Sequence, residues 1–149
     1  MLTVRMFKHA SGVDLALLRT DSIDDGLFKL MVSVPAKHML LPVNGAAAGN
    51  LVVGMSTCYG LFGAGMALHP HDAPFRSLIG PVDTVTFADS AVAFTAFYHQ
   101  MSKGVAIERA VEVMKVASGE EHFGLVDGEI TRMAVRNAIT DLGLKIPAV

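Results

Sequence analysis

The feature that most constrains the fold is an uncharged stretch from residue 45 to residue 68. It contains no Asp, Glu, Lys or Arg. A membrane-spanning helix needs about 20 apolar residues, and this stretch is long enough. Six glycines and several polar side chains dilute it, however. A short apolar run of this kind is typical of a strand buried on both faces, which predicts a strand at 51–57 and no membrane span.

The composition favours one heavily packed domain over residues 1–149. Hydrophobic residues make up 52% of the chain and charged residues 17%, against the usual values of about 45–50% and about 25%. A chain of this length buries a single core. The formal charge is −2 and the twelve Lys and Arg residues are scattered, which argues against nucleic acid as a partner. A single cysteine and the absence of a signal-peptide pattern predict a reduced, cytoplasmic protein.

Strand-like and helix-like segments alternate along the chain. The strand patterns cover residues 2–7, 51–57, 75–80 and 122–126. The helical patterns cover residues 21–31, 89–103, 107–117 and 129–142. Apolar strands that alternate with helices predict an α/β fold with a mostly parallel sheet flanked by helices.

Local signals mark where the helices start and stop. Asp89 or Ser90 is the expected N-cap of the helix at 89–103, and Gly104 is placed to end it. Pro35 and Pro42 should stop any longer helix after the one at 21–31, because proline lacks the N–H group that a helix interior needs. The segment that follows, residues 44–50, is expected to be a turn.

Two reactive side chains follow predicted strands. His9 comes after the first strand and Cys58 after the second. Catalytic groups gather at the carboxyl ends of parallel strands, so the two side chains are expected at one edge of the sheet. A thiol needs a base to become a nucleophile, and His9 could supply it. The competing interpretation is that Cys58 is a buried small hydrophobe.

The sequence "HPHD" offers His69, His71 and Asp72 as metal ligands. The flanking prolines favour a surface loop instead, and no fourth ligand is supplied elsewhere. We therefore expect neither a metal nor another cofactor. The remaining histidines are interpreted as ordinary helix or loop residues: His38, His99 and His122.

Three segments carry a resemblance to a known family: "GNLVVGMSTCYG", "PFRSLIGPVDTVTFADSAVAFTAFYHQMSKGVAIERAVEVM" and "ASGEEHFGL". They give a strand, a Ser/Thr-Cys-x-Gly motif, a strand ending in Gly-Pro, an Asp-led helix with Phe-Tyr near its end, and then G-x-x-I-x-x-A-V. In this order, residues 49–126 resemble the carboxyl-terminal half of bacterial caspase-like domains of the CHAT type, relatives of caspases and separase.

The resemblance implies a three-layer caspase-like fold and a cysteine endopeptidase acting on a protein or peptide. Cys58 matches the position of the nucleophile and His9 that of the general base. The backbone N–H groups of Cys58 and of Ala10 or Gly60 would hold the oxyanion. The family has glycine after its histidine, where this chain has Ala10.

Two other functions remain open at this point. The first is a catalytically silent caspase-like module for binding or assembly, in which Cys58 is a packed thiol. The second is a small membrane-associated protein built on residues 45–68. The family also carries one or two strands and a helix before its histidine strand, so the fold is expected to be truncated at the N-terminus. The uncovered sheet edge would favour a homo-oligomer.

Overall fold

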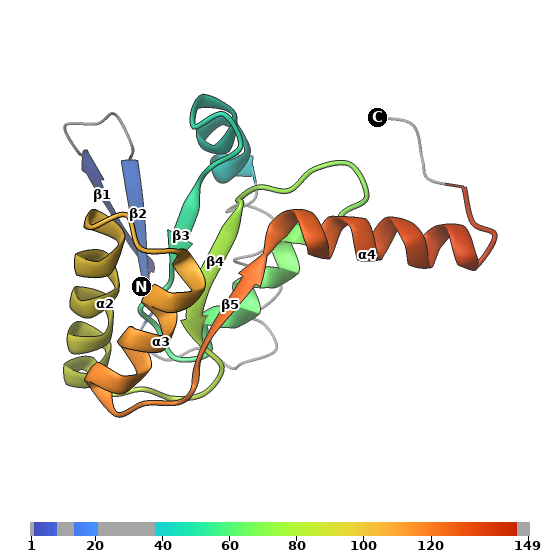
Figure 1. Ribbon diagram of the computed structural model, residues 1–149. Helices are drawn as coiled ribbons and strands as arrows, with labels where there is room; N and C mark the ends of the chain where they lie inside the picture. The colour runs from blue at the N-terminus through green and yellow to red at the C-terminus, as the bar shows by residue number, and fades with distance from the viewer. Residues whose placement is uncertain (1, 9–13, 21–37, 146–149) are drawn as a thin grey trace. The chain divides into compact units, whose positions relative to one another are not determined.

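The computed structural model describes residues 2–8, 14–20 and 38–145 (Figure 1). The chain divides into two compact units whose segments alternate along the sequence. The first unit comprises Met1–Ser22, Val53–Phe62 and Ile79–Leu125. The second unit comprises Ile23–Val52, Gly63–Leu78 and Val126–Val149. The expected helix at 21–31 lies outside the described residues.

The first two strands form a sheet of their own. β1 (Leu2–Lys8) pairs antiparallel with β2 (Asp14–Thr20), with Leu2 opposite Thr20 and Lys8 opposite Asp14. The strand expected at 2–7 is therefore confirmed. Its expected place in one parallel sheet with residues 51–57 and 75–80 is wrong. The five residues between β1 and β2 are too few for the crossover that parallel pairing requires, which is a dozen or more residues.

A second sheet has three strands in the order β3-β4-β5. They are β3 (Val52–Gly54), β4 (Ser77–Pro81) and β5 (Phe123–Asp127). All five residues of β4 are buried, as its continuous apolar run predicts. β3 is shorter than expected, because only three residues of the predicted strand at 51–57 form it.

Strand directions make this sheet mixed. The Arg76 N–H donates to Leu51 O, and the Met55 N–H donates to Ile79 O, so β3 and β4 advance together and are parallel. The expectation of a mostly parallel sheet is nevertheless wrong, because β5 runs the other way.

The reversal of β5 is visible in two further bonds. The Val82 N–H donates to His122 O at one end of the strand pair, and the Gly128 N–H donates to Arg76 O at the other. Residue numbers rise along β4 while those of the partner residues fall along β5, which defines antiparallel pairing. The two connecting helices are long enough for either direction, so the sequence pattern does not distinguish them.

The helices lie close to their expected positions. They are α2 (Phe87–Ser102), α3 (Ile107–Ser118) and α4 (Gly128–Asp141). The N-cap of α2 is Thr86, whose side chain accepts from the Asp89 N–H, so the expected cap at Asp89 or Ser90 is wrong by one turn. Gly104 has a φ of +73°, the left-handed conformation expected of a residue that ends a helix.

Two helical segments were not expected. Residues 38–46 are helical through Pro42, so this proline does not stop the helix. Proline has no N–H group to donate, so it removes one intrahelical hydrogen bond without ending this helix. A 3-10 helix, η1 (Gly60–Ala67), occupies the glycine-rich segment after Cys58.

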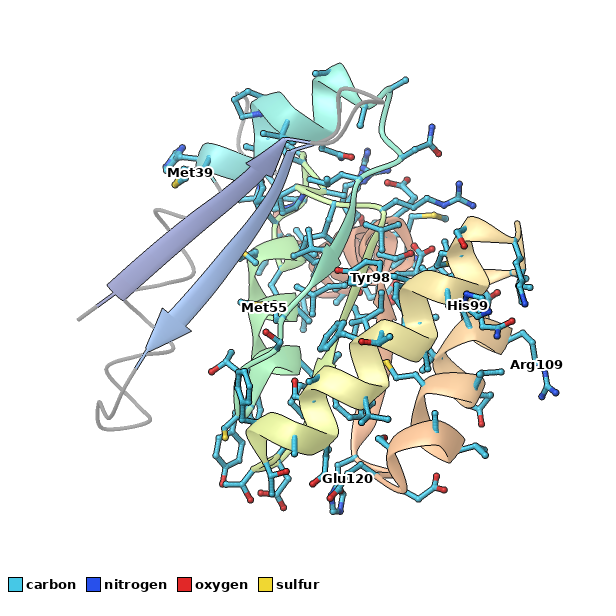
Figure 2. All side chains as sticks on the ribbon, turned by 90° about the vertical axis from the view of Figure 1, so that its left-hand side faces the viewer. Met39, Met55, Tyr98, His99, Arg109 and Glu120 are labelled. Atoms are coloured by element: carbon cyan, nitrogen blue, oxygen red, sulfur yellow. The ribbon has the colours of Figure 1, made fainter. Side chains whose placement is uncertain are left out.

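The core of the first unit has three layers. On one face of the sheet, α2 places the Phe94 ring edge-on to Phe123, with ring centres 5.9 Å apart. On the other face, Leu61 of η1 lies over Gly124. Because Phe123 and Gly124 are neighbours in β5, they point to opposite faces. Helices α2 and α3 pack on each other (Figure 2).

The uncharged stretch at 45–68 is divided among several elements. It contains the end of the helix at 38–46, β3 and η1. Across the described part of the chain, no helix has the length and apolar character that would let it cross a membrane.

Candidate functional site

Cys58 lies in the turn that connects β3 to η1, and it is exposed. The interpretation of this residue as a buried hydrophobe is therefore wrong. Because β3 and β4 are parallel, their carboxyl ends lie at one edge of the sheet. Cys58 follows one of these ends and Asp83 follows the other, so the expected position of the cysteine at a strand's carboxyl end is confirmed.

Close glycine packing fixes the turn. A Cβ atom on Gly60 would come within 2.6 Å of Met55 O, and one on Gly80 within 2.8 Å of the Gly60 carbonyl carbon. A Cβ on Gly124 would lie 2.5 Å from Leu61 Cδ2. Glycine at these positions lets the chain after Cys58 lie directly on β4 and β5. The sequence interpretation gave Gly60 as an oxyanion donor and Gly80 as part of the Gly-Pro that ends a strand, and it did not predict this close packing.

The residue after the cysteine has an unusual backbone conformation. Tyr59 has a φ of +58°, which residues with a side chain rarely adopt. Its N–H donates to Asp83 O at 3.0 Å, which ties the turn to the segment after β4. Strained residues of this kind occur often at functional sites, where the surrounding structure holds them in place.

The backbone N–H groups of Cys58 and Gly60, both expected to hold an oxyanion, differ in whether they already donate a hydrogen bond. The Gly60 N–H already donates to Thr57 O at 2.9 Å. Within the described residues, the Cys58 N–H makes no hydrogen bond. The Cys58 thiol lies 3.7 Å from Val85 O, to which it donates weakly.

A polar cluster lies at the same edge of the sheet. The Thr84 N–H donates to Asp83 Oδ1 at 2.6 Å, and this bond lowers the pKa of the Asp83 carboxyl. Smaller contributions that lower the pKa come from the Tyr59 side chain and from His122. His122 Nδ1 also lies 3.3 Å from Glu120 Oε2.

His122 was not expected near the cysteine turn. It precedes β5, whose amino end lies at the same edge as the carboxyl ends of β3 and β4, because β5 is antiparallel. The sequence interpretation treated His122 as an ordinary helix or loop histidine. The direction of β5, which no local sequence pattern gives, brings it to this edge. The other two expected site residues, His9 and Ala10, lie outside the described residues.

The "HPHD" segment is an irregular loop, as expected. His69 Nδ1 lies 3.8 Å from Asp72 Oδ2, and the rings of His69 and His71 are 5.5 Å apart. Over residues 2–8, 14–20 and 38–145, no three His, Cys, Asp or Glu side chains are grouped to hold a metal ion.

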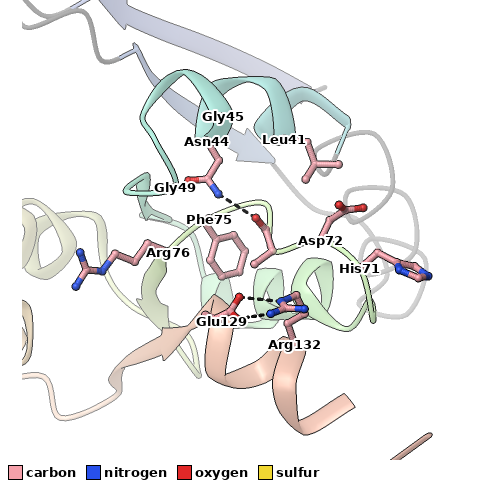
Figure 3. A pocket seen from close by; sticks show the side chains of 11 residues that line it. Leu41, Asn44, Gly45, Gly49, His71, Asp72, Phe75, Arg76, Glu129 and Arg132 are labelled. Atoms are coloured by element: carbon pink, nitrogen blue, oxygen red, sulfur yellow. Dashed lines mark hydrogen bonds and ion pairs between the residues drawn. The ribbon is translucent and has the colours of Figure 1, made fainter. Parts of the chain in front are cut away.

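The second unit contains a cavity of about 520 Å³ (Figure 3). Its walls come from the helix at 38–46, the loop before β4 and the first turn of α4. The Arg132 guanidinium and the Glu129 carboxylate pair with each other there, with Nε 2.8 Å from Oε2. This pairing lowers the pKa of Glu129.

No protein-family model, no curated protein and no solved structure matches this chain.

Proposed function

We propose that the chain is a cysteine endopeptidase with a caspase-like fold, in which Cys58 is the nucleophile. The observation that carries this proposal is the exposed thiol at the sheet edge where two parallel strands end. The order β3, Cys58 turn, β4, α2 and α3 is also the order of segments on which the resemblance rests.

Each residue has a defined role in the proposed reaction. The Cys58 sulfur, after His9 takes its proton, attacks the carbonyl carbon of a peptide bond. The Cys58 N–H, together with that of Ala10, stabilises the oxyanion. His9 then protonates the leaving amine, and the acyl group stays on the sulfur as a thioester. Water hydrolyses the thioester, giving the carboxylic acid and the free thiol. Gly60 is left out of the oxyanion site because its N–H is engaged by Thr57.

A second candidate function is a catalytically silent module for binding or assembly. The observation that favours it is the contact of the Cys58 thiol with Val85 O. A thiol that donates to a carbonyl keeps its proton, whereas the nucleophile is the thiolate. The peptidase reaction therefore requires the Cys58 thiol to leave Val85 O and give up its proton.

Alkylation with iodoacetamide separates the two functions. Cys58 is the single cysteine of the chain, so labelling reports on it alone. An activated thiol reacts at about pH 6, where an ordinary thiol with a pKa of about 8.5 is almost entirely protonated. We expect reaction at this pH, and we expect Cys58→Ala to abolish both labelling and cleavage of unfolded protein substrates. No reaction at this pH and no cleavage would support the silent module.

Histidine variants then identify the base. We expect His9→Gln to abolish labelling at about pH 6 and to lower cleavage by 100-fold or more, on the order of what general base catalysis supplies. His99→Gln, on the exposed part of α2, is the matched control and should leave both unchanged. If His122→Gln lowers labelling and cleavage and His9→Gln does not, the base is instead His122, beside Asp83.

A further inference from the structure

Residues 83–85 contact the cysteine turn at three points. The Tyr59 N–H donates to Asp83 O at 3.0 Å, and the Cys58 thiol donates weakly to Val85 O at 3.7 Å. The Tyr59 side chain also hydrogen-bonds to the Asp83 carboxylate. One short segment after β4 therefore holds both the residue that carries the thiol and the residue that follows it.

Tyr59 is the residue of this turn whose conformation has to be held. Its φ of +58° lies in the left-handed region, which is less favourable for a residue with a side chain than for glycine. Such a conformation persists only where the surrounding structure imposes it. The two hydrogen bonds to Asp83 act in this way, because one engages the backbone of Tyr59 and the other its side chain.

Asp83 is itself fixed by its neighbour in the sequence. The Thr84 N–H donates to Asp83 Oδ1 at 2.6 Å, so the side chain folds back onto the backbone that follows it. A local bond of this kind limits the directions that the Asp83 carbonyl and carboxylate can take. His122 also favours the ionised form of this carboxylate. Asp83 therefore presents both of its acceptors to Tyr59 in fixed directions.

We propose that Asp83 is a positioning residue for Cys58. By holding Tyr59 in the left-handed conformation, Asp83 sets the direction of the preceding residue and keeps the Cys58 sulfur on Val85 O. A thiol that donates to a carbonyl keeps its proton, so the cysteine is held in a resting arrangement until the turn moves. This role rests on the proposed function, in which Cys58 is the nucleophile, but its test needs no peptidase activity.

The rate of Cys58 alkylation measures how often the turn releases the thiol. The chain has one cysteine, so the rate constant for iodoacetamide reports on this residue alone. At about pH 8, close to the ordinary thiol pKa of about 8.5, a released thiol is partly ionised and reacts. In Asp83→Ala we expect this rate constant to rise about fivefold, the change in population that follows from losing one hydrogen bond of ordinary strength. Asp141→Ala makes the same change at the exposed end of α4 and should leave the rate constant unchanged.

The substitution Tyr59→Gly separates positioning from a general loosening of the fold. Glycine adopts a positive φ at no steric cost, so the turn should keep its conformation without the Asp83 side chain. Combined with Asp83→Ala, it should return the rate constant to within about twofold of the unchanged chain, because the left-handed conformation is no longer unfavourable. Tyr59→Phe combined with Asp83→Ala removes the hydroxyl but keeps the unfavourable conformation, and it should label as fast as Asp83→Ala alone. A purely structural role predicts no such difference between the two double variants.

Urea unfolding shows which variants are folded under the labelling conditions. If Asp83→Ala is not folded, Tyr59→Phe alone decides, because it removes one of the two contacts and should also label faster than Asp141→Ala. The proposal is overturned if neither Asp83→Ala nor Tyr59→Phe labels faster than Asp141→Ala, or if the two double variants label at the same rate. Cleavage of unfolded protein is assayed separately on the unchanged chain. Faster alkylation of Asp83→Ala without any cleavage would overturn the proposed function and leave the positioning role, and cleavage without faster alkylation would do the reverse.

Discussion

At the scale of single residues, the edge of the three-stranded sheet is organised around Cys58 and Asp83. Each follows the carboxyl end of a parallel strand, and the Tyr59 N–H joins the two segments by donating to Asp83 O. The Asp83 side chain is held as a carboxylate by the Thr84 N–H. This edge therefore combines a turn with unusual backbone geometry and one ionised side chain.

Titration of Asp83 provides the first prediction. The pKa of its carboxyl is lowered below 3.8, mainly by the Thr84 N–H. A carboxyl whose pKa is lower in the folded state stabilises the fold above the unfolded value, and this contribution is lost as pH falls through the folded value. As the pH falls below about 4, the free energy of unfolding should therefore decrease less in Asp83→Asn than in the unchanged chain. This range follows from the ordinary aspartate pKa of about 3.9.

Nuclear magnetic resonance titration checks the midpoint directly. The Asp83 carboxyl carbon should titrate below the value of an unfolded peptide. Tyr59→Phe removes the phenol hydroxyl and should shift the Asp83 midpoint upward. The shift should be small, because the Thr84 N–H is the larger cause of the lowered pKa. An Asp83 midpoint at or above 3.8 would contradict the assigned hydrogen bond.

At the scale of elements, glycines determine how the Cys58 turn lies on the sheet. Gly80 is a residue of β4, and the turn passes over it with backbone atoms at van der Waals distance. The helices depend instead on buried aromatic side chains, of which Phe97 is 1% exposed. Substitutions at the two kinds of position should therefore destabilise the fold in different ways, by overpacking at Gly80 and by leaving a cavity at Phe97.

Gly80→Ala should destabilise the fold by about 1–3 kcal/mol, the usual cost of overpacking a core. The added Cβ would lie 2.8 Å from both the Gly60 carbonyl carbon and Leu61 N, and backbone atoms cannot move aside easily. Because the turn must shift, the rate of Cys58 alkylation should change too. Gly65→Ala is the control, since its Cβ would meet no atom within 4 Å. Equal unfolding midpoints for the two variants in urea would refute the packing argument.

Phe97→Ala should cost about 3–5 kcal/mol, because it leaves a cavity under α2. The ring of Phe97 also contacts Tyr98 edge-on, with ring centres 5.4 Å apart. Phe87→Ala removes the same side chain from the same helix at a position that is 86% exposed, and its unfolding free energy should stay within about 0.5 kcal/mol. Thermal or urea unfolding at equal protein concentration measures both.

At the scale of the whole molecule, the formal net charge is small. The formal charge is −2 and the pI is about 6.3, so repulsion between copies is small near neutral pH. We therefore expect solubility to be lowest near the pI and to rise at pH values above and below it, which turbidity measured across this pH range checks. A solubility minimum far from the pI would contradict this expectation.

The sequence by itself determined the elements whose signals are local. Apolar periods and terminal glycines predicted α2, α3 and α4 to within about two residues, and the apolar run before Gly80-Pro81 predicted β4. The end of the apolar run before the glycines also placed Cys58 at the carboxyl end of a strand. These signals are readable because capping and burial periodicity depend on residues within one or two turns of each other.

The tertiary structure alone decided which strands pair and in which direction. The pairing of β1 with β2, the reversal of β5 and the resulting position of His122 follow from hydrogen bonds between distant segments, and these leave no local pattern. The same holds for Gly80 and Gly124, whose glycine identity is explained only by the backbone and side chain that lie against them. A strand's side-chain alternation is the same for parallel and antiparallel neighbours, so its direction is fixed only when the chain returns to the sheet.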